Sequence, residues 1–90
     1  MPIIKFTSAL KRFFPDLKEE KIEGNTVAEV LQQLEQKYTG LSDFLLEENG
    51  KVRQHVNVFV GGTLIEDEEN LTDEVGETEE ILIFQALSGG

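Results

Sequence analysis

The sequence has no cysteine and a single histidine, His55, among its 90 residues. A chain without cysteine has no disulfide, no thiolate nucleophile, no iron–sulfur cluster and no cysteine-type zinc site. One histidine also excludes metal motifs that need a histidine pair. Most catalytic arrangements, which depend on cysteine or on paired histidines, are therefore excluded, and we expect no metal site.

Basic residues are also few. Eight Lys and Arg stand against 18 Asp and Glu, which gives a formal net charge of −10 at pH 7. This charge repels nucleic acid and anionic membrane surfaces, so the expected partners are proteins. No apolar run approaches the ~20 residues of a membrane span, and no apolar stretch typical of a signal peptide begins the chain. We therefore expect a soluble, cytoplasmic protein.

The length of the chain allows one compact core and no second domain. β-forming residues and alternating apolar positions predict strands over residues 2–7, 17–23, 52–60, 63–65 and 81–87. The first two are expected to pair as a hairpin, and Gly61-Gly62 is typical of the tight turn between the third and fourth. The last is an almost unbroken apolar run, which indicates a strand in the middle of a sheet.

One long helix is predicted after Thr26. Thr26 and Glu29 form a capping-box pattern, and an apolar stripe with helical spacing follows it. Gly40 is placed to end the helix in a left-handed conformation, and residues 41–46 are expected to add one helical turn over the core. One helix can cover one face of one sheet, so the pattern predicts a two-layer α+β domain whose other sheet face stays exposed.

Residues 66–80 hold nine acids and no base, with Leu71 and Val75 as apolar anchors. This composition predicts a solvated loop. The run lacks the spacing and the closing glutamate of a calcium-binding loop.

The uncovered sheet face can be assigned by alternation along the third and last strands. If the valines of the third strand face the helix, four apolar side chains point outward: Phe59, Leu82, Phe84 and Ala86. Burying the two phenylalanines is worth roughly 3–6 kcal/mol, against an association cost of ~4–15 kcal/mol, so this face favours transient binding of a protein. The alternative is that residues 8–14 cover Phe59 or Phe84.

His55 is expected on the same outward face. A lone histidine with no nucleophile or orienting partner carries no catalysis, so we assign no catalytic residue and expect a protein that is not an enzyme.

The sequence ends with Gly89 and Gly90, directly after the last strand. A frayed terminus or a cloning remnant would give the same ending. A tail without side chains can also thread into a narrow active site and present the Gly90 carboxylate to a nucleophile. A free carboxylate is unreactive, so this use requires another enzyme to activate it with ATP, and the chain itself would bind no cofactor.

The β-β-α-β-β order, the segment HVNVFVGG at residues 55–62 and the ending ILIFQALSGG at residues 81–90 resemble the ubiquitin-related β-grasp sulfur carriers of the MoaD/ThiS family. The resemblance covers essentially the whole chain. It implies a β-grasp domain over residues 1–87 and a flexible tail over residues 88–90. Its VNVFV segment and its length are more similar to carriers of the molybdopterin and cysteine pathways than to thiamine carriers.

In that family an E1-like enzyme adenylates the terminal glycine, which becomes a thiocarboxylate that donates sulfur to molybdopterin, thiamine or cysteine biosynthesis. The resemblance therefore implies that Gly90 reacts, that Gly89, Ser88 and Leu87 thread the partner, and that no residues after Gly90 need removal. It implies two partners, the E1-like adenylating enzyme and a sulfur-acceptor synthase subunit, which use the outward sheet face. A molybdopterin synthase-like complex would hold such a chain as its non-catalytic small subunit. Thr7 stands where some relatives carry a further aromatic residue.

Two other functions remain open from the sequence. A ubiquitin-like modifier would be joined through Gly90 to lysines of other proteins. A purely structural interaction module would use the face around Phe59 and Phe84 and would not need the tail.

Overall fold

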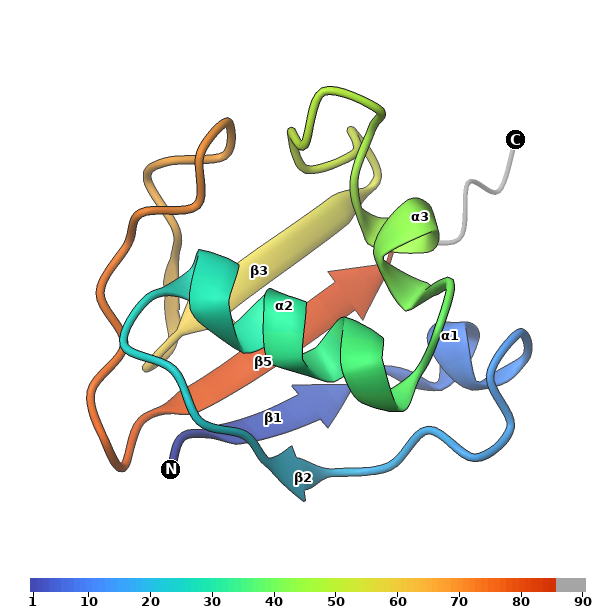
Figure 1. The fold of residues 1–90 in the computed structure, drawn as a ribbon, viewed down its shortest axis with the longest axis horizontal. Coiled ribbons are helices and arrows are strands. Elements are labelled where there is room, and N and C mark those ends of the chain that lie inside the picture. The colour runs from blue at the N-terminus through green and yellow to red at the C-terminus, as the bar shows by residue number, and fades with distance from the viewer. Residues whose placement is uncertain (86–90) are drawn as a thin grey trace.

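The computed structural model describes residues 1–85, which form five strands and three helices. The elements in chain order are β1 Ile3–Phe6, α1 Ser8–Lys11, β2 Glu20–Lys21, α2 Val27–Lys37, α3 Leu41–Leu45, β3 Val56–Val60, β4 Thr63–Leu64 and β5 Glu80–Gln85. The strands form one sheet in the order β2-β1-β5-β3-β4, and α2 crosses one face of it (Figure 1). The predicted two-layer α+β architecture is confirmed. The boundary between the domain and the expected tail lies outside the described residues.

β5 is the central strand of the sheet, as its apolar run predicts. It pairs parallel with β1 and antiparallel with β3. Ile81 and Ile83 of β5 are fully buried, and they pack with Ile4 of β1 and Val58 of β3. The first and last strands of the chain therefore share one core.

Helix α2 begins where the capping residues predict. Thr26 Oγ1 accepts a hydrogen bond from the backbone N–H of Glu29 at 3.2 Å. The Glu29 carboxylate accepts from the backbone N–H of Asn25 at 2.9 Å, one residue before the N-cap. The buried side of the helix is apolar and consists of Val27, Val30, Leu31 and Leu34.

The turn between α2 and α3 is held by Gly40 and Glu35. Gly40 has φ of 95°, the left-handed conformation that the sequence predicts there. The Glu35 carboxylate accepts from the backbone N–H groups of Gly40 at 2.8 Å and Ser42 at 2.9 Å. These two hydrogen bonds lower the pKa of Glu35, and the bond from Gly40 has the larger effect. Helix α3 is the single predicted turn, with Leu41 and Leu45 buried over the core.

The structure differs from the prediction in the third strand, in the second strand and in the loop after β1. The third strand begins at Val56 and not at residue 52, because the Val52 N–H donates to the Glu68 carbonyl and Val52 bridges to Leu46. The chain then turns at residues 53–55, so His55 lies in this turn and not in a strand of the outward face. The second strand shortens to two residues. Helix α1, which the sequence pattern does not predict, fills part of the loop after β1.

The acidic segment forms a loop, as predicted, with Leu71 and Val75 buried. Carboxylates of this loop accept hydrogen bonds from backbone N–H groups of the same loop. Asp73 accepts from the N–H groups of Glu66 and Asp67, and Asp67 accepts from the Thr72 hydroxyl and the Asn70 N–H. The Thr72 bond is the main cause that lowers the pKa of Asp67.

A cluster of side-chain hydrogen bonds connects β2 to the end of α2; it consists of Glu20, Lys37 and Tyr38. Lys37 Nζ donates to Glu20 at 2.7 Å, and the Tyr38 hydroxyl donates to the other Glu20 oxygen. Partial burial, together with Glu20, raises the pKa of Tyr38 to about 12. The hydrogen bond from Lys37, and to a smaller extent that from Tyr38, lowers the pKa of Glu20 below its ordinary value of 4.5. Only 11% of the Glu20 side chain is exposed, so these bonds lie largely out of water.

This arrangement predicts pH-dependent stability. A lowered pKa in the folded state adds stability above pH 4.5, and that stability is lost as the pH falls through the folded pKa. Glu20→Gln should lower the free energy of unfolding by about 1 kcal/mol at pH 7. This is less than the ~1.5–3 kcal/mol typical of a hydrogen bond to a charged group, because Lys37 is half exposed. Urea denaturation should show the difference from the wild type shrinking below pH 4.5. Glu23→Gln, an exposed change on the same segment, is the control. An equal loss in both variants would contradict the role of this cluster.

No helix among residues 1–85 has the length and apolar character to cross a membrane. The longest is α2, with 11 residues.

Candidate partner-binding face and reactive tail

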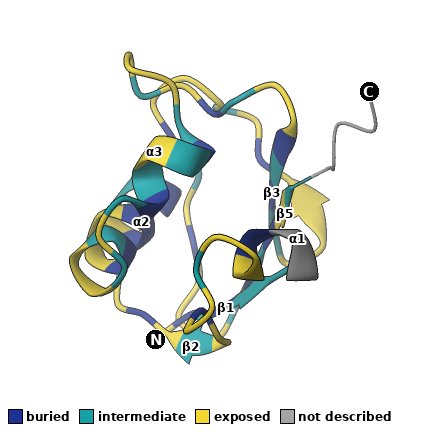
Figure 2. Cartoon of the chain, turned by 90° about the vertical axis from the view of Figure 1, so that its right-hand side faces the viewer, coloured by how far each residue is buried: buried dark blue, intermediate teal, exposed yellow. Residues whose placement is uncertain are grey.

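The sheet face opposite α2 carries a row of apolar side chains across neighbouring strands. The strand register places Leu64 of β4 beside Phe59 of β3, and Phe59 beside Leu82 of β5. Phe84 lies one step further along β5, opposite Asn57. Leu64 is 42% exposed and Phe84 is 41% exposed, whereas Phe59 and Leu82 are half-buried. Figure 2 shows the two layers from the side, with α2 and α3 on the other side of the sheet.

This arrangement brings together three of the residues that the sequence assigns to the face: Phe59, Leu82 and Phe84. The fourth, Ala86, lies outside the described residues. Leu64 was missed, although it could have been found from the sequence. A two-residue turn at Gly61-Gly62, where both glycines have positive φ, pairs Leu64 with Phe59. Alternation then turns Ile65 to the core, where it is 5% exposed.

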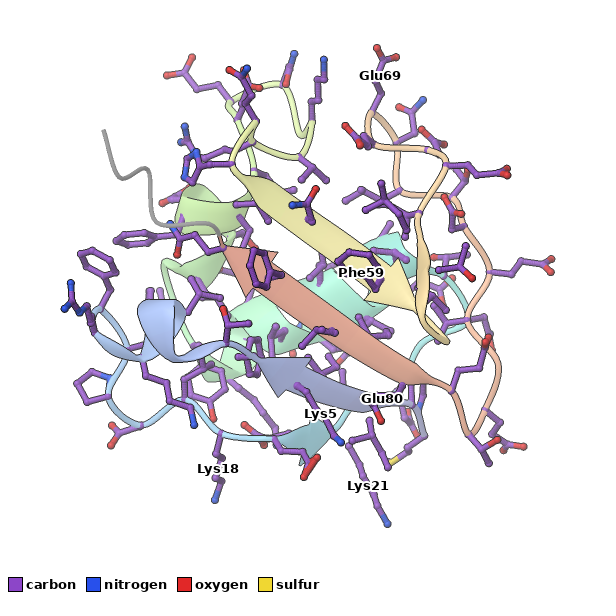
Figure 3. All side chains as sticks on the ribbon, turned by 180° about the vertical axis from the view of Figure 1, so that it is seen from behind. Lys5, Lys18, Lys21, Phe59, Glu69 and Glu80 are labelled. Atoms are coloured by element: carbon purple, nitrogen blue, oxygen red, sulfur yellow. The ribbon has the colours of Figure 1, made fainter. Side chains whose placement is uncertain are left out.

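Residues 8–14 do not cover Phe84, so the alternative that the sequence left open is wrong for this side chain. The rings of Phe13 and Phe14 pack instead against the ring of Phe44 in α3, with centroid distances of 4.9 and 5.3 Å. The Phe84 side chain remains 41% exposed. Phe59 lies on the same outer face of β3 (Figure 3).

Lys5 continues the same row of the sheet on β1, next to Leu82. Its ammonium lies 3.2 Å from a Glu80 oxygen and 3.5 Å from a Glu19 oxygen. The pKa of Lys5 is raised, mainly by its hydrogen bond with Glu80. Lys5 and Glu80 point from neighbouring strands toward one another (Figure 3). Because all three side chains are about half exposed, they give the apolar row a polar rim.

The tail begins at a fixed point of the fold. Gln85 ends β5, and its backbone N–H donates to Thr7 Oγ1 at 3.4 Å. Thr7 thus lies beside the last described residue. Leu87, Ser88, Gly89 and Gly90 lie outside the described residues, so their roles stay predictions.

His55 is exposed and lines a shallow depression with residues from α3 and β5. Residues 1–85 contain no group of three His, Cys, Asp or Glu side chains that could hold a metal ion.

A β-grasp sheet, an apolar outer face and a central last strand that leads to a diglycine define the class of small ubiquitin-like carrier and modifier proteins. The chain belongs to the ThiS family, whose model matches residues 4–90. The predicted family and fold are confirmed.

Two relatives show the range of this class. Small archaeal modifier protein 3 of Haloferax volcanii is 32% identical over 65 residues, which cover 72% of this chain and 70% of the relative. The sulfur carrier protein CysO of Mycobacterium tuberculosis is 27% identical over 75 residues, 81% of each chain. These relatives are carriers and modifiers, not enzymes. The chain is accordingly a carrier or modifier protein and not an enzyme.

Solved structures show the same fold. A chain of the BexX/CysO complex of Amycolatopsis orientalis superposes with a TM-score of 0.85 at 23% identity, over 100% of both chains. CysO of Mycobacterium tuberculosis superposes with a TM-score of 0.83 at 21% identity, over 97% of this chain and 100% of the other.

Substitution by Asp at two adjacent residues of β5, one on each face of the sheet, should reduce the stability of the fold by very different amounts. Phe84→Asp should keep the fold and cost about 1 kcal/mol, the range of strand preferences at exposed sites. Ile83→Asp should unfold the domain, because Ile83 is fully buried and an unpaired buried charge costs several kcal/mol. Circular dichroism during thermal unfolding measures both. If Phe84→Asp also unfolded the chain, the assignment of this face would be wrong.

Proposed function

We propose that this protein is a sulfur carrier whose Gly90 is adenylated by an E1-like enzyme and then converted to a thiocarboxylate. The observation that carries this proposal is the match to the ThiS family, which extends through Gly90. Relatives named as sulfur carriers support the transfer of sulfur. The chain would be consumed and regenerated as a substrate and would hold no cofactor of its own.

The chemistry needs a free terminus and little else from this chain. A Gly90 carboxylate oxygen attacks the α-phosphorus of ATP, and pyrophosphate leaves. A sulfide equivalent from a sulfur donor then attacks the acyl carbon of the adenylate, and AMP leaves with the carboxylate oxygen. The product is the Gly90 thiocarboxylate. Glycines at positions 89 and 90 present no side chain to this attack, and Leu87 and Ser88 would lie in the partner's channel.

The apolar face supports repeated docking on two partners. We propose that Leu64, Phe59, Leu82 and Phe84, together with Ala86, contact first the E1-like enzyme and then a sulfur-acceptor synthase subunit. The limited exposed apolar area suits a carrier that must leave each partner. A related CysO forms a complex with BexX, which supports the use of partner proteins. Molybdopterin, thiamine-type and cysteine-type pathways are the candidate acceptors, and ATP-dependent activation agrees with the expected cytoplasmic location.

Intact mass spectrometry tests the reaction. After incubation with the adenylating enzyme from the same organism, ATP and a sulfide source, the mass should rise by the difference between sulfur and oxygen. Tandem fragmentation should place the change on Gly90. A chain without Gly90 is the control and should not change. An unchanged wild-type mass, with an enzyme shown to adenylate another carrier, would contradict the proposal.

Protein modification is a second candidate function, favoured by the 32% identity to a small archaeal modifier protein. Conjugation would begin with the same Gly90 adenylate, but a lysine amine of a target protein would take the place of sulfide. An epitope-tagged chain expressed in its own organism should then give larger bands on a denaturing gel. These bands should resist thiol reductant and disappear when Gly90 is deleted. Bands that persist in the deleted chain would contradict conjugation through Gly90.

A further inference from the structure

A second surface, with two aromatic rings among polar side chains, lies at the end of β5, apart from the outer sheet face. A shallow depression there is lined by Phe13, Asp43, Phe44, Arg53, His55 and Gln85. The rings of Phe13 and Phe44 are stacked in a tilted pair 4.9 Å apart, and Phe13 is 56% exposed. Gln85 is the residue from which the chain continues toward Gly90. The last described residue of the chain therefore lies in the same depression as this ring pair.

Three cationic residues lie close to the ring pair in the fold or in the sequence: Arg53 lines the depression, and Lys11 and Arg12 lie on the segment that carries Phe13. Lys11 and Arg12 directly precede Phe13, and both are exposed. Arg53 Nε donates to the Asp43 carbonyl at 3.0 Å, which fixes the guanidinium beside Phe44. Within residues 1–85 the ion pairs are formed by Lys5 and Lys37, so these three cations have no acidic partner there. Asp43 is the one acid among the residues that line the depression.

The rest of the molecule has the opposite charge. Residues 66–80 carry nine acids and lead into the start of β5, whereas the ring pair lies where β5 ends. Figure 1 shows this loop and the α1–α3 end on opposite sides of the domain. A basic partner would be attracted to the acidic loop and would meet the end of the molecule from which the tail does not emerge. An acidic partner surface is steered to the end with the tail.

We propose that Lys11, Arg12, Phe13, Phe44 and Arg53, which we call the basic–aromatic patch, bind an acidic segment of the adenylating enzyme beside the channel that receives the tail. Carboxylates of this segment would contact the guanidinium groups of Arg12 and Arg53, a pairing with favourable geometry. An apolar side chain of the same segment would lie on the rings of Phe13 and Phe44. The proposal rests on the proposed function, and it adds the chemistry of the partner surface and its location.

The first test uses a synthetic peptide of alternating glutamate and leucine with the full-length ¹⁵N-labelled chain. The largest shift changes should occur at Phe13, Phe44 and Arg53. Arg12→Glu should weaken peptide binding about fivefold, the upper range for one exposed ion pair, and high salt should remove the difference. Lys21→Glu is the matched control, because it makes the same charge change beside Ile3, near the start of β5. It should leave peptide binding unchanged.

The second test measures ATP–pyrophosphate exchange by the adenylating enzyme from the same organism. Arg12→Glu should raise the KM for the carrier about fivefold with an unchanged kcat, whereas Lys21→Glu should change neither. Equal effects of the two variants in both tests would overturn the proposal, as would peptide shifts confined to the outer sheet face. Self-association that Arg12→Glu abolishes would also overturn it by assigning the patch to a second copy. If the wild type supports no exchange, the proposed function fails, while the peptide test still decides the nature of the patch.

Discussion

The parallel pairing of β1 with β5 is the interaction on which the rest of the structure depends. It aligns Ile4 with Ile81 and Phe6 with Ile83, so the two ends of the chain close one core. Because β3 occupies the other edge of β5, the last strand is paired on both sides. A strand held in this way gives the following residues a fixed starting point. The pairing joins distant parts of the sequence, so its loop-closure cost is met only when most of the domain forms.

Alternation along β5 couples this core to the outer face. Ile81 and Ile83 point to the helix layer, while Leu82 and Phe84 point away from it. A shift of one residue in the register would bury the outer-face residues and expose the core. The same holds for Val58 and Phe59 on β3. The position of the outer face is therefore determined by the packing under α2, and its residues can change without a loss of core contacts.

The sequence predicts those parts of the structure that local patterns determine. Helix α2 has its cap and apolar stripe within one segment, and the turn at Gly61-Gly62 requires positive φ at adjacent residues. The start of β3 was not predictable in this way. Val52 continues the alternation, yet its backbone bonds to Glu68 and Leu46, contacts that no local pattern encodes. The contact between Phe13 and Phe44 is not predictable for the same reason, because it joins the turn after α1 to α3, which is distant in sequence.

In the proposed function, the outer face and the basic–aromatic patch would make different physical contributions to binding and release. Full burial of the two exposed side chains, Leu64 and Phe84, is worth about 1.5–3 kcal/mol each, or roughly 3–6 kcal/mol together. This gain only reaches the low end of the ~4–15 kcal/mol cost of association. The face alone therefore gives a short-lived complex. Exposed charges such as Arg12 mainly raise the rate of encounter and orient it, with little gain in residence time. A carrier that used both surfaces as proposed would find its partner quickly with the tail directed inward, and it would still dissociate after the proposed reaction of the tail.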